Sequence, residues 1–246
     1  MSRGVAGELH VLCAGAVKGL IGALAADFEA SSGLRLHATF GAVGAMRDAL
    51  RAGAPCDVFI ATAALVDALA SAAALRTGTA RPIGRVQTAV AVRAGAPPPP
   101  LDDGEALRAA LLGASAIYFP DATLSTAGAH VARVLEQLAI RDAVAARLRM
   151  FANGATAMHA LAVEGDARAL GCTQATEIRA TPGLALVAPL PAPFALATVY
   201  SAAVAASARD DDAAAALVAL LTGEASAALR SAGGFDDPAA PSQRAG

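Results

Sequence analysis

Two short stretches of small residues near the start of the chain have the pattern of a backbone anion site. In each, an apolar run leads into a turn and then into a helical pattern, over residues 9–18 and 34–44. A helix N-terminus carries unsatisfied backbone N–H groups and about half a positive charge, so two such ends directed at one point bind a small anion. Small side chains let a ligand approach the backbone. The candidate binding residues are Ala14, Gly15, Ala16 and Val17 at the first turn and Ala42, Val43 and Gly44 at the second.

Polar side chains near predicted helix starts add to this backbone site. Lys18 is the only lysine in the chain and falls in the first turn of the first helix, where a cation opposes the helix dipole. An ammonium group there would pair with a ligand carboxylate; a solvated surface lysine is the alternative, and the residues leave both open. The other ligand-binding candidates are Thr126, Ala127 and Gly128 at the start of a later helix, with the side chains of Thr156 and Gln174. Hydroxyl and amide groups suit an organic acid, although a single threonine is more often a strand or cap residue.

Three titratable side chains are candidates for general acid–base chemistry: His130, Asp121 and Glu177. His130 falls in the first turn of the helix that starts near Thr126, where a histidine is more often a structural hydrogen-bond donor. The sequence contains no catalytic-triad, metal-site or phosphate-loop pattern. We therefore expect no metal and no cofactor.

Composition narrows the class of protein. The chain is 56% hydrophobic and 16% charged, which excludes general disorder, and its 246 residues suffice for a substantial core. The net charge of −2 and the lack of a basic run argue against a nucleic-acid partner. No strongly apolar run reaches 18 residues. The three cysteines, Cys13, Cys56 and Cys172, lack metal-like spacing, and we expect small buried side chains.

The order of predicted elements indicates an α/β fold. Strand patterns occur at residues 9–13, 34–40, 57–61, 86–93, 116–119, 170–173, 184–188 and 198–203, with helical patterns between most of them, including 128–138 and 213–221. Strands that alternate with helices predict a mostly parallel sheet with ligands at the carboxyl ends of its strands. Proline-rich segments at 96–100 and 189–193 predict loops. The strands at 86–93 and 198–203 are candidates for two crossings between domains.

Several of these segments resemble a known family. The first strand and helix, residues 39–46, the run Arg51-Ala-Gly-Ala-Pro-Cys-Asp-Val-Phe-Ile60 and the closing residues 224–235 are similar to periplasmic solute-binding proteins of the molybdate-binding type, which serve ABC transporters. The resemblance covers nearly the whole chain. It implies a type II periplasmic-binding-protein fold with a central cleft and two crossover hinge strands. The implied lobes are 8–82 plus 195–246 and 83–194.

The resemblance also implies a function and partners: a monomer that captures a small anion for an ABC transporter permease in the membrane. The family's hydroxyl donors are missing here, because its turn serines fall on Ala16, Ala42 and Val43 and its tyrosine falls on Gln174. Each lost donor to a buried charge costs about 1.5–3 kcal/mol. The site residues therefore favour a small organic carboxylate over a molybdate-like oxyanion.

An enzyme on the same scaffold is the alternative that the sequence leaves open. The chain is also similar to aconitate isomerase, whose reaction requires a base and an acid beside the substrate carbon. His130, Asp121 and Glu177 would carry that role, but we expect a binding protein rather than an enzyme. The family resemblance implies a periplasmic location, whereas residues 1–8 lack the apolar core and cleavage site of a signal peptide and, as written, predict the cytoplasm.

Overall fold

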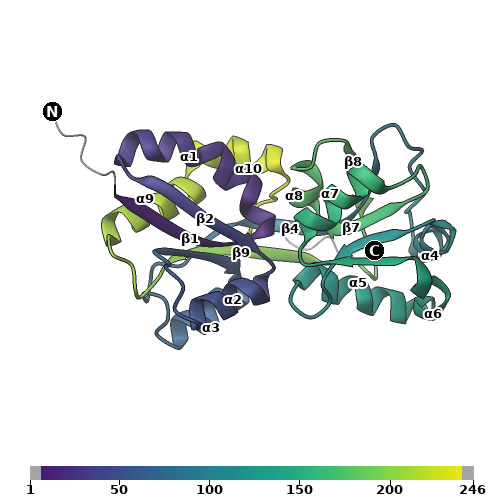
Figure 1. Ribbon diagram of the computed structural model, residues 1–246, viewed down its shortest axis with the longest axis horizontal. Coiled ribbons are helices and arrows are strands. Elements are labelled where there is room, and N and C mark those ends of the chain that lie inside the picture. Colours follow the sequence, from purple (N-terminus) through teal and green to yellow (C-terminus); the bar gives the residue numbers. More distant parts are fainter. Residues whose placement is uncertain (1–6, 240–246) are drawn as a thin grey trace. The chain divides into compact units, whose positions relative to one another are not determined.

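The computed structural model describes residues 7–239 of the chain, which form two compact units. Unit 1 contains the described residues up to Arg85 and Val199–Pro238; unit 2 contains Val86–Thr198 and Ala239. In each unit helices cover a β-sheet, which confirms the α/β fold (Figure 1). The two predicted lobes have boundaries a few residues away from these and stay a prediction, and residues 240–246 lie outside the described part.

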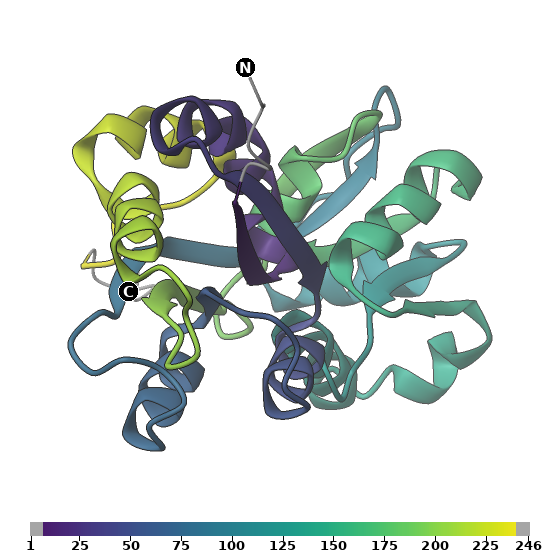
Figure 2. The same ribbon diagram turned by 60° about the vertical axis from the view of Figure 1, so that its left-hand side comes forward.

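The strands of unit 1 are β1 (Glu8–Ala14), β2 (Arg35–Gly41), β3 (Val58–Thr62) and β9 (Ala197–Val204), in the order β2-β1-β3-β9. β1 is parallel to β2 and β3, and β9 is antiparallel to β3. Figure 2 shows β1 and β2 side by side. In their register Ala14 is opposite Gly41, so the two strands end level with each other. The residues that follow them therefore start from one edge of the sheet.

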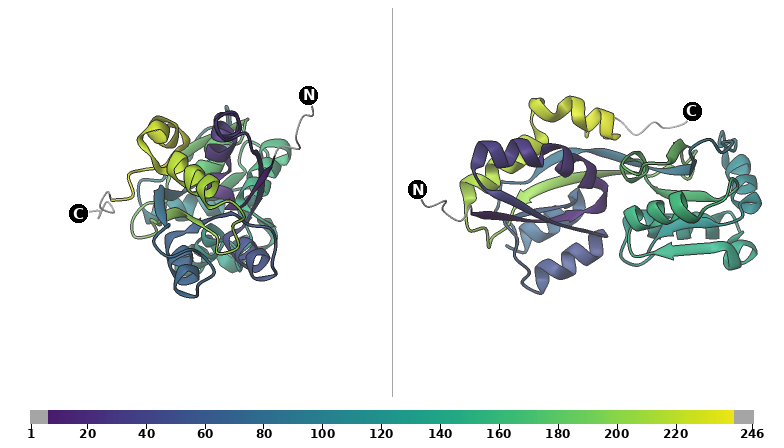
Figure 3. Two further views of the ribbon diagram at one scale, coloured as in Figure 1. Left: turned by 90° about the vertical axis from the view of Figure 1, so that its left-hand side faces the viewer. Right: turned by 45° about the horizontal axis from the view of Figure 1, so that its top comes forward.

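The helices of unit 1 are η1 (Gly15–Val17), α1 (Lys18–Ser32), α2 (Val43–Arg51), α3 (Ala63–Ser71), α9 (Asp211–Thr222), η3 (Glu224–Ser226) and α10 (Ala227–Gly233). α1 packs against α9 and α10 on one face of the strands, and α2 and α3 cover the other (Figures 1 and 3). The apolar residues at helical spacing on α1, Leu20, Ile21, Leu24 and Phe28, are buried as predicted. Each such side chain stabilises the fold by about 1.5–3 kcal/mol.

Unit 2 is built on β4 (Arg81–Arg93), β5 (Ile117–Pro120), β6 (Leu148–Phe151), β7 (Leu170–Gln174) and β8 (Leu184–Pro189), in the order β8-β4-β7-β5-β6. β5 is parallel to β6 and β7, whereas β4 is antiparallel to β7 and β8. Its helices are α4 (Gly104–Gly113), α5 (Thr126–Gln137), α6 (Arg141–Val144), η2 (Ala145–Arg147), α7 (Gly154–Glu164) and α8 (Ala175–Arg179). The apolar core between α4, α5, α6 and the sheet includes Val90, Leu107, Val131, Val144 and Cys172.

The strand predictions are largely confirmed, with two corrections. β6 was not predicted: it has four residues, of which Arg149 and Met150 are exposed, so it lacks a long apolar run. The prediction of a mostly parallel sheet is wrong for β4, β8 and β9, which run antiparallel to their neighbours. Both β4 and β9 contain a unit boundary, at Arg85/Val86 and Thr198/Val199.

Two further sequence predictions concern the cysteines and membrane-spanning helices. All three cysteines are free and buried, as predicted, and burial raises the pKa of the thiols of Cys56 and Cys172 to about 12. In the described part of the chain, no single helix is long and apolar enough to cross a membrane; α9 and the η3–α10 segment meet that test only as a pair bent by 51°.

Candidate functional site

The two predicted anion-binding turns lie next to each other in unit 1. Ala14 and Ala42 are the N-cap residues of η1 and α2, and both have extended backbone conformations. Within residues 7–239, neither of these helix starts donates a backbone N–H to an N-cap side chain, because alanine has no acceptor there. Because Ala14 is opposite Gly41 in the sheet, both helix starts lie at the carboxyl ends of the neighbouring strands β1 and β2. Partial positive charge from two helices is therefore concentrated at one edge of unit 1.

Lys18 places a full positive charge at this edge. It is exposed, it is the first residue of α1, and its Nζ lies 5.7 Å from the centroid of the Phe40 ring. Phe40 comes one residue before the end of β2, next to the second turn. The ammonium group thus lies near the end of β2, and its contact with the ring is a cation–π interaction.

In unit 2, the start of α5 follows a loop ordered by Asp121. The Asp121 carboxylate accepts hydrogen bonds from the Thr123 N–H (2.7 Å), the Thr123 hydroxyl (2.6 Å) and the Leu124 N–H (2.8 Å). The bond from the Thr123 hydroxyl is the main reason why the pKa of Asp121 lies below its usual value. Ser125 then caps α5 by accepting a bond from the Gly128 N–H at 3.3 Å. Asp121 therefore has a structural role, and its catalytic role stays a prediction.

His130 is held by the chain itself. Its Nε2 lies 2.7 Å from the Phe194 carbonyl oxygen, and the ring is partly buried. Burial lowers the pKa of the imidazole, against the opposing effect of this hydrogen bond. A neutral ring that donates from Nε2 fits this geometry, which is the structural role that the sequence left open.

Thr156 is committed to the start of α7. Its hydroxyl donates to the Asn153 carbonyl oxygen (2.8 Å) and accepts from the Asn153 N–H (3.2 Å), while the Asn153 side chain accepts from the Thr156 N–H (2.9 Å). These bonds form a capping box that stabilises α7. The Thr156 hydroxyl is therefore less available to a ligand than the sequence suggested.

Gln174, by contrast, is buried without a partner. Its side chain is 2% exposed, and in the described part of the chain neither its Oε1 nor its Nε2 has a hydrogen-bond partner. The same holds for the hydroxyl oxygens of Thr88 and Thr176, which sequence reasoning did not select. Both threonines look like ordinary strand and helix residues, so no sequence signal distinguishes them. Unpaired buried polar groups of this kind are rare in proteins and point to a missing partner.

Glu177 is a buried carboxyl group beside Gln174, between the end of β7 and the start of α7. The Thr173 hydroxyl donates to its Oε2 at 2.5 Å, and a Cβ atom at Gly154 would lie 1.9 Å from the same oxygen. Burial raises the pKa of Glu177 to about 7, although hydrogen bonds from the Thr173 hydroxyl and from the backbone of Gln174 and Ala155 lower it. This carboxyl group can therefore gain or lose a proton near neutral pH.

Replacing Glu177 by glutamine is expected to change the pH dependence of stability. The ordinary pKa of 4.5 applies to the unfolded chain, and the folded value is about 7. As the pH rises between these values, the unfolded chain releases its proton while the folded chain keeps it, so this group lowers the wild-type unfolding free energy. We expect a loss on the order of 2–3 kcal/mol that Glu177→Gln abolishes.

Urea denaturation at pH 4.5, 6 and 8 measures this effect. The exposed Glu136→Gln should keep the wild-type pH dependence, because Glu136 is an exposed partner of Arg141. A Glu177→Gln variant with the same pH dependence as the wild type would contradict the assignment.

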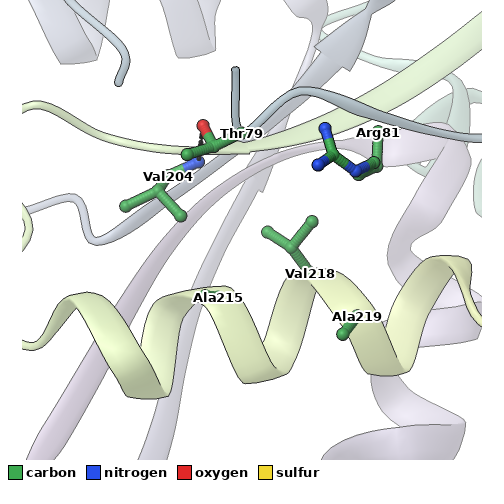
Figure 4. Close-up of a pocket in the computed structure, with 6 residues that line it drawn as sticks. All are labelled: Thr79, Arg81, Val204, Ala215, Val218 and Ala219. Atoms are coloured by element: carbon green, nitrogen blue, oxygen red, sulfur yellow. Dashed lines mark hydrogen bonds between the residues drawn. The ribbon is translucent and has the colours of Figure 1, made fainter. Parts of the chain in front are cut away.

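A separate pocket in unit 1 does not contain the predicted site residues. Its lining residues are Thr79, Arg81, Val204, Ala215, Val218 and Ala219 (Figure 4). The Thr79 hydroxyl donates to the Arg76 carbonyl oxygen at 2.7 Å, and Arg81 donates to the carbonyl oxygens of Gly78 and Ala80. These bonds use the Thr79 hydroxyl and one guanidinium nitrogen of Arg81, and the other lining residues are apolar.

Comparison with known proteins identifies the family. The model of the bacterial extracellular solute-binding protein family matches residues 9–236. The chain belongs to this family. In solved structures, the periplasmic molybdate-binding protein of Azotobacter vinelandii matches with a TM-score of 0.76 and 21% identity, over 95% of this chain and 100% of that one. The sulfate-binding protein SubI of Mycobacterium tuberculosis H37Rv matches with a TM-score of 0.69 and 19% identity, over 96% and 88%.

A third relative has the name of an enzyme. Aconitate isomerase from a Pseudomonas species is 28% identical over 202 residues, which are 80% of this chain and 75% of that protein. The structural matches are below 25% identity and show the fold alone. The family membership places this chain among the bacterial extracellular solute-binding proteins and does not name its ligand.

Proposed function

We propose that this chain binds a small organic carboxylate and delivers it, as a monomer, to an ABC transporter permease. The observation that carries the proposal is the pair of helix starts at Ala14 and Ala42, adjacent at one strand edge, with Lys18 beside them. In unit 1 the backbone of Ala14–Val17 and Ala42–Gly44 would supply N–H donors and Lys18 an ammonium group, while Thr126–Gly128 and Gln174 are the candidate binding residues of unit 2. Thr156 stays a candidate binding residue, although its hydroxyl already bonds to the Asn153 backbone.

The residue types at the turns favour a carboxylate over a tetrahedral oxyanion. Ala16, Ala42 and Val43 offer no hydroxyl donors, and a missing donor to a buried charge costs about 1.5–3 kcal/mol. The ammonium of Lys18 supplies instead a charge that pairs well with a carboxylate. The molybdate- and sulfate-binding neighbours support the binding of an anion in general.

Thermal unfolding with a panel of anions tests the proposal. A ligand that binds only the folded state raises the melting temperature by mass action. Di- and tricarboxylates should raise it, whereas molybdate, tungstate and sulfate should have a smaller effect at equal concentration. Stabilisation by molybdate and tungstate alone would show that the backbone donors suffice and would overturn the preference for a carboxylate.

Replacing Lys18 by alanine is expected to weaken carboxylate binding at least tenfold, about 1.4 kcal/mol. The reason is the loss of the only ammonium at the strand edge where the two helix starts lie. Calorimetric titration of both proteins with the same carboxylate measures the change. Arg47→Ala is the matched control, because it also removes one positive charge near the start of α2 but takes it from an ion pair with Asp48. A Lys18→Ala effect below twofold would remove Lys18 from the site.

An isomerase acting on a small tricarboxylic acid is the second candidate function. The relative named aconitate isomerase and the pKa of Glu177 near 7 favour it, because shifting a double bond needs a base and an acid near neutral pH. Incubation with cis- and trans-aconitate, followed by proton NMR, tests it. Interconversion that Glu177→Gln abolishes would support an isomerase. If no interconversion occurs at high protein concentration, the isomerase is excluded and the binding function remains.

A further inference from the structure

Three buried side chains of unit 2 share one property: their polar atoms have no partner. In the described chain, these atoms are the Oγ1 of Thr88, the Oε1 and Nε2 of Gln174, and the Oγ1 of Thr176. The three side chains are between 0% and 5% exposed, so water in bulk does not reach them. Leaving a buried donor or acceptor unpaired costs free energy, so a bound group that pairs with these atoms recovers that cost.

The strand register brings two of these groups together. Thr88 on β4 is directly opposite Gln174 on β7 in an antiparallel pair, so their side chains point to the same face with Cβ atoms about 5 Å apart. Thr176 follows two residues after Gln174, in the first turn of α8. We call Thr88, Gln174 and Thr176 the polar trio.

Thr88 and Gln174 lie on the face of the sheet that α5 covers. Along β4 and β7, Val90 and Cys172 point into the core with α5, and side chains two residues apart share a face. Thr88 and Gln174 therefore continue this row at the end of β7. β7 is parallel to β5, and the loop after β5 leads to the start of α5 at Thr126. The trio and this helix start thus belong to the same strand edge of unit 2.

The polar groups of the trio are uncharged, and they include both hydrogen-bond donors and hydrogen-bond acceptors. Gln174 offers two N–H donors and a carbonyl acceptor, and each threonine hydroxyl both donates and accepts. A molybdate, sulfate or carboxylate oxygen only accepts, so it would leave the Gln174 carbonyl oxygen unpaired. A hydroxyl group donates and accepts, and it can satisfy both sides of the Gln174 amide.

We propose that the trio recognises a hydroxyl group on the ligand, so that the chain selects small hydroxycarboxylates over carboxylates of the same charge that lack the hydroxyl. The inference rests on the proposed function, because it takes the ligand to be a carboxylate whose charged group binds at the start of α5, in the same unit as the trio. Sites that hydrogen-bond a ligand hydroxyl reject the analogue without it strongly, because their own polar groups are then left unpaired.

Calorimetric titration of the full chain with two matched pairs of ligands tests the selection. Malate and succinate differ by one hydroxyl, as do citrate and tricarballylate. We expect the hydroxylated member of at least one pair to bind ten times more tightly or better. Equal affinity within each pair would overturn the inference while leaving carboxylate binding in place. No binding of any carboxylate would overturn the proposed function as well.

Two apolar variants test whether the trio binds a ligand hydroxyl or a structural water molecule. Gln174→Met and Thr88→Val keep the side-chain shapes but remove the polar atoms, so the preference for malate over succinate should fall below threefold. Because these atoms have no partner among residues 7–239, the melting temperature of the ligand-free variants should be unchanged or higher. Thr222→Val, whose hydroxyl bonds to the Val218 carbonyl oxygen at 2.8 Å in unit 1, should keep the preference. Variants that melt earlier and retain the preference would show that the trio holds structural water, and would overturn the inference.

Discussion

Alanine at position 128 is expected to lower the free energy of unfolding by about 4 kcal/mol, a size reached only by severe core defects. Gly128 lies in the first turn of α5, where a Cβ atom would be 2.2 Å from the Asp121 carbonyl oxygen and 2.3 Å from that of Pro120. These are backbone atoms, and Asp121 is tied down because its N–H donates to the Phe151 carbonyl oxygen at 2.7 Å. The loop or the helix start must shift, so we also expect weaker anion binding.

Gly22→Ala is the control for Gly128→Ala. Gly22 lies inside α1, and a Cβ atom there would have nothing within 4 Å. Alanine at an exposed helix position is more favourable than glycine by about 1 kcal/mol, so Gly22→Ala should leave stability unchanged or raise it. Urea denaturation of both variants gives the comparison. A Gly128→Ala protein as stable as the wild type would show that the start of α5 is not packed against residues 120–121.

Asp57→Ala is the second change with a large expected effect, a loss of about 3–5 kcal/mol of unfolding free energy. The Asp57 side chain is buried and accepts hydrogen bonds from the His10 N–H (2.7 Å), the Arg209 N–H (2.9 Å) and the Arg209 guanidinium (3.2 Å). These bonds tie β1 and the segment before α9 to the start of β3. Alanine leaves the two backbone donors without this acceptor.

The same carboxylate gives the wild type an acid-sensitive contribution to stability. Burial raises the pKa of Asp57. The hydrogen bonds from His10 and Arg209 lower it by a larger amount, so the pKa lies below its ordinary value of 3.8. The stabilisation is therefore present above pH 3.8 and is lost as the pH falls towards the folded value. Asp48→Asn, at an exposed ion pair with Arg47, should cost little. A loss below about 1 kcal/mol for Asp57→Ala would contradict this role.

Much of the fold could be predicted from the sequence because burial leaves a periodic pattern. Leu20, Ile21, Leu24 and Phe28 have helical spacing, and all four are buried on α1. Strand direction has no such signal: β4 and β9 have the apolar content of parallel strands but pair antiparallel. The short strand β6 was missed because two of its four side chains are exposed.

The helix starts of the candidate site could be predicted from the sequence, while their role in ligand binding stays a prediction. The small residues at Ala14 and Ala42 mark helix starts, and these starts are adjacent in unit 1. The partners of polar side chains depend on residues far away in the sequence, such as the Phe194 carbonyl oxygen that binds His130. For the same reason Thr88, which lies 86 positions before Gln174, could not be linked to it without the strand register.

Calorimetric titration of the full chain with malate and, separately, with molybdate tests the central claim most directly. The account predicts one malate bound per chain, with a dissociation constant at least ten times lower than that of molybdate. Tight binding of molybdate without measurable binding of malate would contradict it, because the backbone N–H groups would then hold a tetrahedral oxyanion without any help from hydroxyl side chains.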